Sequence, residues 1–167
     1  MRVAGIDPGT IHTGVGIVDG SPNTEILVFY KTIDANPKDS LPNRLGLIHA
    51  ELVKIFETWK PEVVAIENIF FYKDFKAAVK IGEARAAAMI AASRCNVPIV
   101  EYLPTRVKQS ICGNGRAAKT QTEFMIRQIL QIREPLSADS ADALAVALCH
   151  LYMSKFDRLK KEEVSYV

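Results

Sequence analysis

The chain has 167 residues and is 49% hydrophobic, which is typical of one globular domain with a full core. Its formal net charge of +2 permits a polyanionic partner without requiring one. The longest apolar run, residues 143–153, is interrupted by His150 and is too short to span a bilayer. With no signal-peptide pattern and three widely spaced cysteines, the sequence excludes disulfide-rich secreted proteins and predicts a cytoplasmic protein that does not bind membranes.

The first third of the chain consists of short apolar runs separated by turns. Three consecutive strands are predicted, at residues 2–7, 14–19 and 24–33. Because tight turns join them, they are expected to form an antiparallel meander. Apolar side chains then recur at steps of three and four from Leu41 to Trp59, which predicts a helix that Ser40 caps and Lys60-Pro61 ends.

Strands and helices alternate in the rest of the chain. Two more strands are predicted at residues 62–67 and 99–102, with helices at 74–94, 105–112, 117–132 and from 137 onward. A meander followed by β-α-β units predicts an α/β fold, a mixed five-stranded sheet flanked by helices. We expect one domain over residues 1–153 and a polar tail, partly helical or frayed, over residues 154–167.

Two aspartates open an otherwise apolar helix in the segment SADSADALAVALCH, residues 137–150. Asp139 and Asp142 are three positions apart, so they lie on one helix face about 60° apart around the axis. If Ser137 is the N-cap, an acid in the first turn favours the helix dipole. That purely structural role explains Asp139 but not Asp142, which lies more than a turn inside the helix.

Two further acids end predicted strands. Asp7 is the last residue of the run 2–7, and Glu67 is the last residue of the run 62–67. If these strands are neighbours, both side chains project toward one spot, and a helix packed on that face adds Asp139 and Asp142. Four carboxylates without matching buried cations cannot all stay ionised in a dry site, whereas hard divalent cations resolve the conflict. Two Mg²⁺ ions about 3.5–4 Å apart would suit phosphodiester cleavage.

Four blocks of the sequence carry a resemblance to a known family: GIDPGTIHTGVGIV, AIENIFF, VKQSICGNGRAAK and ADSADALAVALCH. In this order and spacing, over residues 2 to 152, they resemble the bacterial RuvC Holliday-junction resolvases. The resemblance implies a ribonuclease H-like fold and a homodimer that nicks two opposing strands of a four-way DNA junction with Mg²⁺ or Mn²⁺. It also implies the branch-migration proteins RuvA and RuvB as partners, and it places the metal-binding acids on Asp7, Glu67, Asp139 and Asp142.

Basic residues that could contact DNA phosphates cluster in two places. One cluster follows the strand that ends in Glu67 and contains Lys73, Lys76 and Lys80. The other surrounds the GNG turn and contains Arg106, Lys108, Arg116 and Lys119. Lys108 and Lys119 match basic positions of the family motif, and the glycines of the turn would let the backbone approach a phosphate closely. An ordinary solvated surface is the alternative for the remaining cations.

Adjacent aromatic residues, Phe70 and Phe71, follow the same strand. Because neighbouring side chains point in different directions, we expect at least one of them to pack in the core. The other would stack on an unpaired base at the centre of the junction, an interaction worth about 1–3 kcal/mol. The family's base-stacking aromatic falls on Phe70. His12, in the loop after Asp7, is expected not to contact the substrate.

Three alternatives accompany the resolvase hypothesis. The first is another metal-dependent nuclease of the ribonuclease H-like fold. The second is an ATP-binding protein of the actin-like or sugar-kinase type, because DPGTIHTG resembles their phosphate loop. That class needs a second lobe, for which 167 residues leave no room. The third is a non-catalytic junction-binding module, which would gain nothing from an acidic cluster.

Overall fold

A five-stranded mixed sheet forms the centre of the molecule. The structure, a computed structural model, describes residues 1–20, 24–68 and 75–164. The strand order is β3-β2-β1-β4-β5, with the strands at Arg2–Asp7 (β1), His12–Gly20 (β2), Glu25–Asp34 (β3), Val63–Glu67 (β4) and Ile99–Tyr102 (β5). The first three strands pair antiparallel, β4 pairs with β1 in parallel, and β5 pairs with β4 in parallel. The predicted meander and mixed sheet are confirmed.

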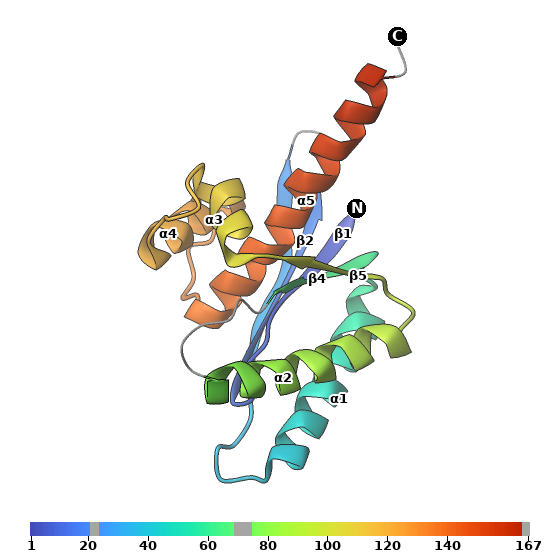
Figure 1. Cartoon of the computed structure of the whole chain (residues 1–167), viewed down its shortest axis with the longest axis vertical. Helices are drawn as coiled ribbons and strands as arrows, with labels where there is room; N and C mark the ends of the chain where they lie inside the picture. The colour runs from blue at the N-terminus through green and yellow to red at the C-terminus, as the bar shows by residue number, and fades with distance from the viewer. Residues whose placement is uncertain (21–23, 69–74, 165–167) are drawn as a thin grey trace.

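Helices cover both faces of this sheet (Figure 1). Two helices, Leu41–Trp59 (α1) and Phe75–Arg94 (α2), pack on one face, and the long helix Ala138–Val164 (α5) crosses the other. Two shorter helices, Pro104–Cys112 (α3) and Lys119–Leu130 (α4), lie beside α5. In the described part of the chain, no helix has the length and apolar character needed to span a membrane.

The alternation of side chains along β1 decides which face receives Asp7. Val3 belongs to the core beneath α5, whereas Ala4 and Ile6 belong to the core beneath α1 and α2. Successive side chains of a strand point to opposite faces, so Asp7 shares the α5 face with Val3. Val64 and Ile66 of β4 belong to the core beneath α1 and α2, so the same alternation puts Glu67 on the α5 face.

Glycines on β1 and β2 allow α5 to pack closely against the sheet. A Cβ atom built on Gly5 would lie 2.0 Å from the carbonyl oxygen of Ala143. Gly16 stands opposite Gly5 in the β1–β2 pair, and its Cβ would lie 2.6 Å from side-chain atoms of Leu144. The helix backbone therefore lies directly on the sheet backbone, a contact that a side chain at either position would prevent.

The element boundaries agree with the sequence-based prediction to within a few residues. Helix α4 starts at Lys119 rather than at residue 117, and β2 starts two residues early, at His12. Helix α5 runs on to Val164 without a break at residue 153, so residues 154–164 continue the helix into the predicted tail. The domain boundary at residue 153 stays a prediction.

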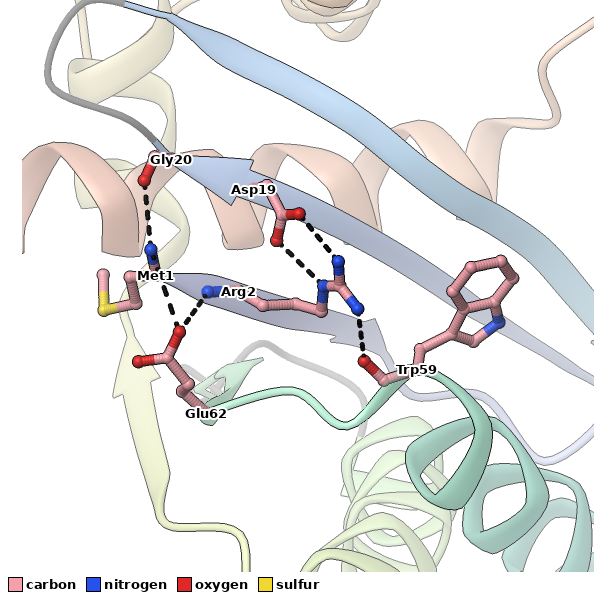
Figure 2. A network of polar contacts seen from close by, with 6 residues as sticks. All are labelled: Met1, Arg2, Asp19, Gly20, Trp59 and Glu62. Carbon is pink, nitrogen blue, oxygen red and sulfur yellow. Dashed lines mark hydrogen bonds and ion pairs between the residues drawn. The ribbon is translucent and has the colours of Figure 1, made fainter.

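A polar network ties β1 to its neighbours at the end of the sheet opposite Asp7 (Figure 2). The Arg2 guanidinium donates two hydrogen bonds to Asp19 on β2, at 2.9 and 2.8 Å, and a third to the carbonyl of Trp59 at the end of α1, at 2.8 Å. This bidentate pairing lowers the pKa of the Asp19 carboxyl. The backbone N–H of Arg2 donates to Glu62 at 2.8 Å, which anchors the chain just before β4.

Candidate active site

The four predicted acids lie at one end of the sheet. Asp7 ends β1 and Glu67 ends β4, and these strands are parallel neighbours in which Ile6 stands beside Ile66. Both carboxylates therefore leave the same edge of the sheet on the face that α5 covers. The expectation that these two strands are neighbours is confirmed.

Helix α5 brings Asp139 and Asp142 to this edge through a close backbone contact. Gly14 stands opposite Asp7 in the β1–β2 pair. A Cβ atom on Gly14 would lie only 2.0 Å from the carbonyl oxygen of Asp139, so the first turn of α5 rests on the strand beside Asp7. The sequence patterns considered above do not predict this close contact, although the recurrence of glycine at alternate positions of β2 is a signal for it.

The start of α5 is held by three hydroxyl groups. The Ser137 Oγ accepts a hydrogen bond from the backbone N–H of Ser140 at 3.2 Å, which confirms Ser137 as the N-cap. Thr32 on β3 hydrogen bonds to the hydroxyls of Ser137 and Ser140, at 2.6 and 3.0 Å. Since Ser137 caps the helix, the Asp139 carboxylate is not needed for that task.

Electrostatic repulsion among the acids shifts their protonation. Burial, followed by the charges of Asp142, Glu67 and Asp139, raises the pKa of Asp7 to about 7, against the opposing effect of Lys119. Burial and the charge of Asp142 also raise the pKa of Glu67. The site thus holds more negative charge than its neighbouring cations neutralise, as the sequence analysis expected.

One of the predicted DNA-binding lysines is paired with an acid. The Lys119 Nζ donates to Asp142 Oδ2 at 2.7 Å, and this hydrogen bond raises the pKa of Lys119. Lys119 is 60% exposed and Asp142 is 29% exposed, so the pair stands at the mouth of the site. The sequence predicts a phosphate contact for Lys119 but not this carboxylate partner, because no local pattern connects α4 to α5.

A cavity of about 210 Å³ opens between these groups. Glu67, Asp142, Lys108 and Lys119 contribute its charged walls. The charge of Lys108 opposes the rise in the pKa of Glu67, so this lysine also acts on the acidic site. The cavity combines carboxylates that favour cations with lysines that favour phosphates.

The donor chemistry of the four acids fits hard divalent cations. All four offer carboxylate oxygens, the ligands that Mg²⁺ and Mn²⁺ prefer, and the raised pKa of Asp7 records a deficit of positive charge. Within residues 1–20, 24–68 and 75–164, no three His, Cys, Asp or Glu side chains are already arranged to hold a metal ion. Asp142 would have to give up its ion pair with Lys119 to bind such an ion.

The GNG turn between α3 and α4 is closed by its own hydrogen bonds. Gln109 donates to the carbonyl of Gly113 at 2.8 Å and accepts from the N–H of Gly115 at 3.0 Å. The N–H of Arg116 donates to Asn114 Oδ1 at 2.9 Å. Gly113, at φ 70°, ends α3 in the left-handed region. The N–H groups of Gly115 and Arg116 thus donate hydrogen bonds within the turn. The glycines therefore serve to form the turn that connects the helices carrying Lys108 and Lys119.

Other predicted contacts lie apart from the acids or outside the described residues. Lys76 is exposed in the first turn of α2, and Arg116 is exposed on the GNG turn. Phe70 and Phe71 lie outside the described residues, as does Lys73. His12 is exposed and pairs with Asp34, Nδ1 to Oδ1, at 2.7 Å.

Comparisons with known proteins identify the family. A sequence model described as crossover junction endodeoxyribonuclease RuvC matches residues 3–150. The chain belongs to the RuvC family. Curated members include proteins from Magnetococcus marinus, 41% identical over 90% of this chain and 84% of the relative, and from Caldicellulosiruptor saccharolyticus, 43% identical over 98% and 100%. RuvC proteins are divalent-metal-dependent nucleases, so this chain is an enzyme that hydrolyses DNA.

Solved structures agree with this assignment. The RuvC of T. thermophilus, solved in complex with a Holliday junction substrate, has a TM-score of 0.89 and 38% identity, and the match covers 94% of this chain and 96% of that one. The yeast mitochondrial Holliday junction resolvase Ydc2 has a TM-score of 0.68 at 13% identity, covers 99% of this chain and 84% of that one, and shows the shared fold alone. The ribonuclease H-like fold predicted from the sequence is confirmed.

Proposed function

We propose that this chain resolves four-way (Holliday) DNA junctions by symmetric paired nicks during recombination and repair, with Asp7, Glu67, Asp139 and Asp142 as its metal ligands. The observation that carries the proposal is the meeting of four acids from β1, β4 and α5 at one end of the sheet, where burial and then mutual repulsion raise the pKa of Asp7 to about 7. The similar T. thermophilus protein was solved with a Holliday junction substrate, which supports the same substrate here.

Mg²⁺ is the proposed cofactor, with two ions in each active site and Mn²⁺ as a substitute. When bound, the two ions supply an activated water and stabilise the leaving oxygen. The four carboxylates would supply the oxygen ligands, two from the ends of β1 and β4 and two from the first turns of α5. The resemblance to the family implies that His can stand in place of Asp139, which favours a ligand role for this position over a need for its charge.

Lys108 and Lys119 are the proposed phosphate contacts beside the scissile bond. Both line the cavity that also contains Glu67 and Asp142. If a bound cation took Asp142 as a ligand, the Lys119 ammonium would lose its carboxylate partner and be available to a phosphate. Arg116 and Lys76, both exposed, are proposed as more distant phosphate contacts, and Phe70 as the residue that stacks on a base.

A homodimer is the proposed assembly, because two copies related by a two-fold axis would present two active sites to opposing strands. Large apolar side chains that do not line any cavity described below are exposed on α2, at Ile81 (38%) and Ile90 (61%), and they support a contact between copies. RuvA and RuvB are the proposed partners. The proposed location is the cytoplasm, which the three free cysteines support.

A junction-cleavage assay tests the proposal. The protein is incubated with a labelled four-way junction and, separately, with linear duplex DNA of the same sequence, in Mg²⁺ without ATP. Paired symmetric nicks in the junction alone are expected. Equal cleavage of the linear duplex would favour a general nuclease of this fold. An uncut junction together with ATP binding would favour the kinase-like alternative.

A further inference from the structure

A second cavity, away from the acids, lies between the first turns of α1 and α2. Its volume is about 360 Å³. Six residues line it: Leu41, Arg44, Lys76, Val79, Lys80 and Glu83. Three of them are cations and one is an acid, and the other two form an apolar wall. Both helices begin here, so the positive ends of their dipoles add to the local potential.

Arg44 is the unusual member of this group. Its Nη1 donates to the carbonyl oxygen of Thr10 at 3.2 Å and to the Thr10 hydroxyl at 3.4 Å. Its Nε is buried and has no hydrogen-bond partner within the described ranges of the chain. Among the residues that the structure describes, no carboxylate forms an ion pair with Arg44. A partly buried guanidinium with only neutral partners is costly, and an anion in the cavity would offset this cost.

The contact with Thr10 connects this cavity to the acidic site. Thr10 is 7% exposed and belongs to the turn that follows Asp7 at the end of β1. The Thr13 hydroxyl donates to the carbonyl of Gly9 at 2.7 Å and closes the same turn. Arg44 therefore holds the turn that directly follows Asp7, from the side of the sheet that α1 and α2 cover.

The chemistry of the cavity matches a sugar-phosphate unit. Phosphate oxygens suit the guanidinium and the two ammonium groups, and a deoxyribose suits the apolar wall of Leu41 and Val79. We infer that this cavity binds a second phosphate of the DNA strand, on the opposite side of the Asp7 turn from the phosphate that is cut. The inference rests on the proposed function and assigns Arg44 and Lys80 to substrate binding.

The test measures junction binding in metal-free buffer, where the DNA stays intact, at several salt concentrations. Lys80→Gln is the primary variant, because Lys80 is exposed on α2 and no ion pair holds it among the described residues. Its affinity should fall about 3- to 10-fold, and the slope of log affinity against log salt should lessen by up to about one unit. Lys80→Arg should restore most of the binding.

Lys54→Gln is the matched control, because it removes the same charge from an exposed position of α1 that does not line the cavity. It should bind like the unaltered protein. Arg44→Lys should bind less tightly than the unaltered protein, since it keeps the charge but loses the planar donor arrangement.

Four outcomes separate the possibilities. If the unaltered protein does not bind the junction, the proposed function fails. If it binds and Lys80→Gln binds equally well with the same salt slope, the second phosphate site is refuted. A site for free phosphate alone would show thermal stabilisation by inorganic phosphate that Lys80→Gln abolishes, with junction affinity unchanged, and this also refutes the DNA assignment. A sedimentation change in Lys80→Gln but not in Lys54→Gln would assign the cavity to contact between copies instead.

Discussion

Gly14 of β2 lies directly against the backbone carbonyl of Asp139, where a Cβ atom would approach the oxygen to 2.0 Å. This contact determines how far the first turn of α5 lies from Asp7, which is paired with Gly14 across the sheet. The geometry of the acidic site therefore depends on the absence of a side chain at a residue that is itself no candidate ligand.

Gly14→Ala should weaken both folding and metal binding, because the added methyl group must displace the α5 backbone. We expect a loss of about 1–3 kcal/mol in the free energy of unfolding, as for other overpacked positions. Gly46→Ala is the control, since nothing lies within 4 Å of a Cβ at that position in α1. It should stabilise the protein by about 0.5–1 kcal/mol. Denaturant titrations measure the free energy of unfolding of both variants, and calorimetry measures their Mg²⁺ affinity. A Gly14→Ala variant as stable as the unaltered protein would contradict the close contact between Gly14 and Asp139.

Asp139→Asn and Asp142→Asn should lower the cleavage rate by orders of magnitude while junction binding persists or tightens. Each change removes a metal ligand and a charge that repels phosphate. Asp139→His should keep more activity than Asp139→Asn, because imidazole still binds a metal. Nicking rates are the measurement, with melting temperatures recorded with and without Mg²⁺. If both Asn variants cut at the normal rate, the two acids are not metal ligands, and Asp139 has only the structural role of favouring the helix dipole.

Binding of Mg²⁺ should weaken as the pH falls below about 7, because the pKa of Asp7 is raised to about 7 and the protonated carboxyl is a poor ligand. Calorimetry in buffers of different ionisation enthalpy should detect proton release on binding near this pH. Affinity that stays constant from pH 6 to pH 8 would contradict the raised pKa.

Stability without metal should depend on pH in the opposite sense to that of a salt-bridged acid. The pKa of Asp7 rises from the ordinary 3.8 to about 7 on folding, so its contribution is greatest below pH 4 and is lost as the pH rises toward 7. Asp7→Asn removes this loss and should raise the melting temperature at pH 8 in metal-free buffer. An unchanged or lower melting temperature would show that the repulsion is relieved in another way.

Lys119→Ala should lower the melting temperature in a way that depends on metal, and it should weaken junction binding. In metal-free buffer it removes the hydrogen-bonded partner of Asp142 and should lower the melting temperature. With Mg²⁺ present this loss should shrink, because the ion neutralises the same carboxylate. Junction binding should weaken across all sequences, with the salt slope lessened by up to about one unit, as for Lys108→Ala. If both variants bind the junction as tightly as the unaltered protein at all salt concentrations, these lysines are ordinary surface residues.

Local patterns in the sequence determined the elements and the acids of this site. Alternating side chains put Asp7 and Glu67 at the ends of apolar strands, and helical spacing put Asp139 and Asp142 on one face. The capping role of Ser137 could also be predicted, because a cap is a relation between residues three positions apart. Such short-range rules depend on backbone geometry alone, and they hold in the folded chain.

Tertiary structure alone decided what surrounds the acids. Three contacts at or near the site join segments that are distant in sequence. They are the ion pair of Lys119 with Asp142, the close packing of Gly14 against Asp139, and the hydrogen bonds of Arg44 to Thr10. No periodicity encodes these relations, since each depends on how one element packs on another. The raised pKa of Asp7 has the same origin, because burial and the repulsion of charges across the site exist only once β1, β4 and α5 have come together.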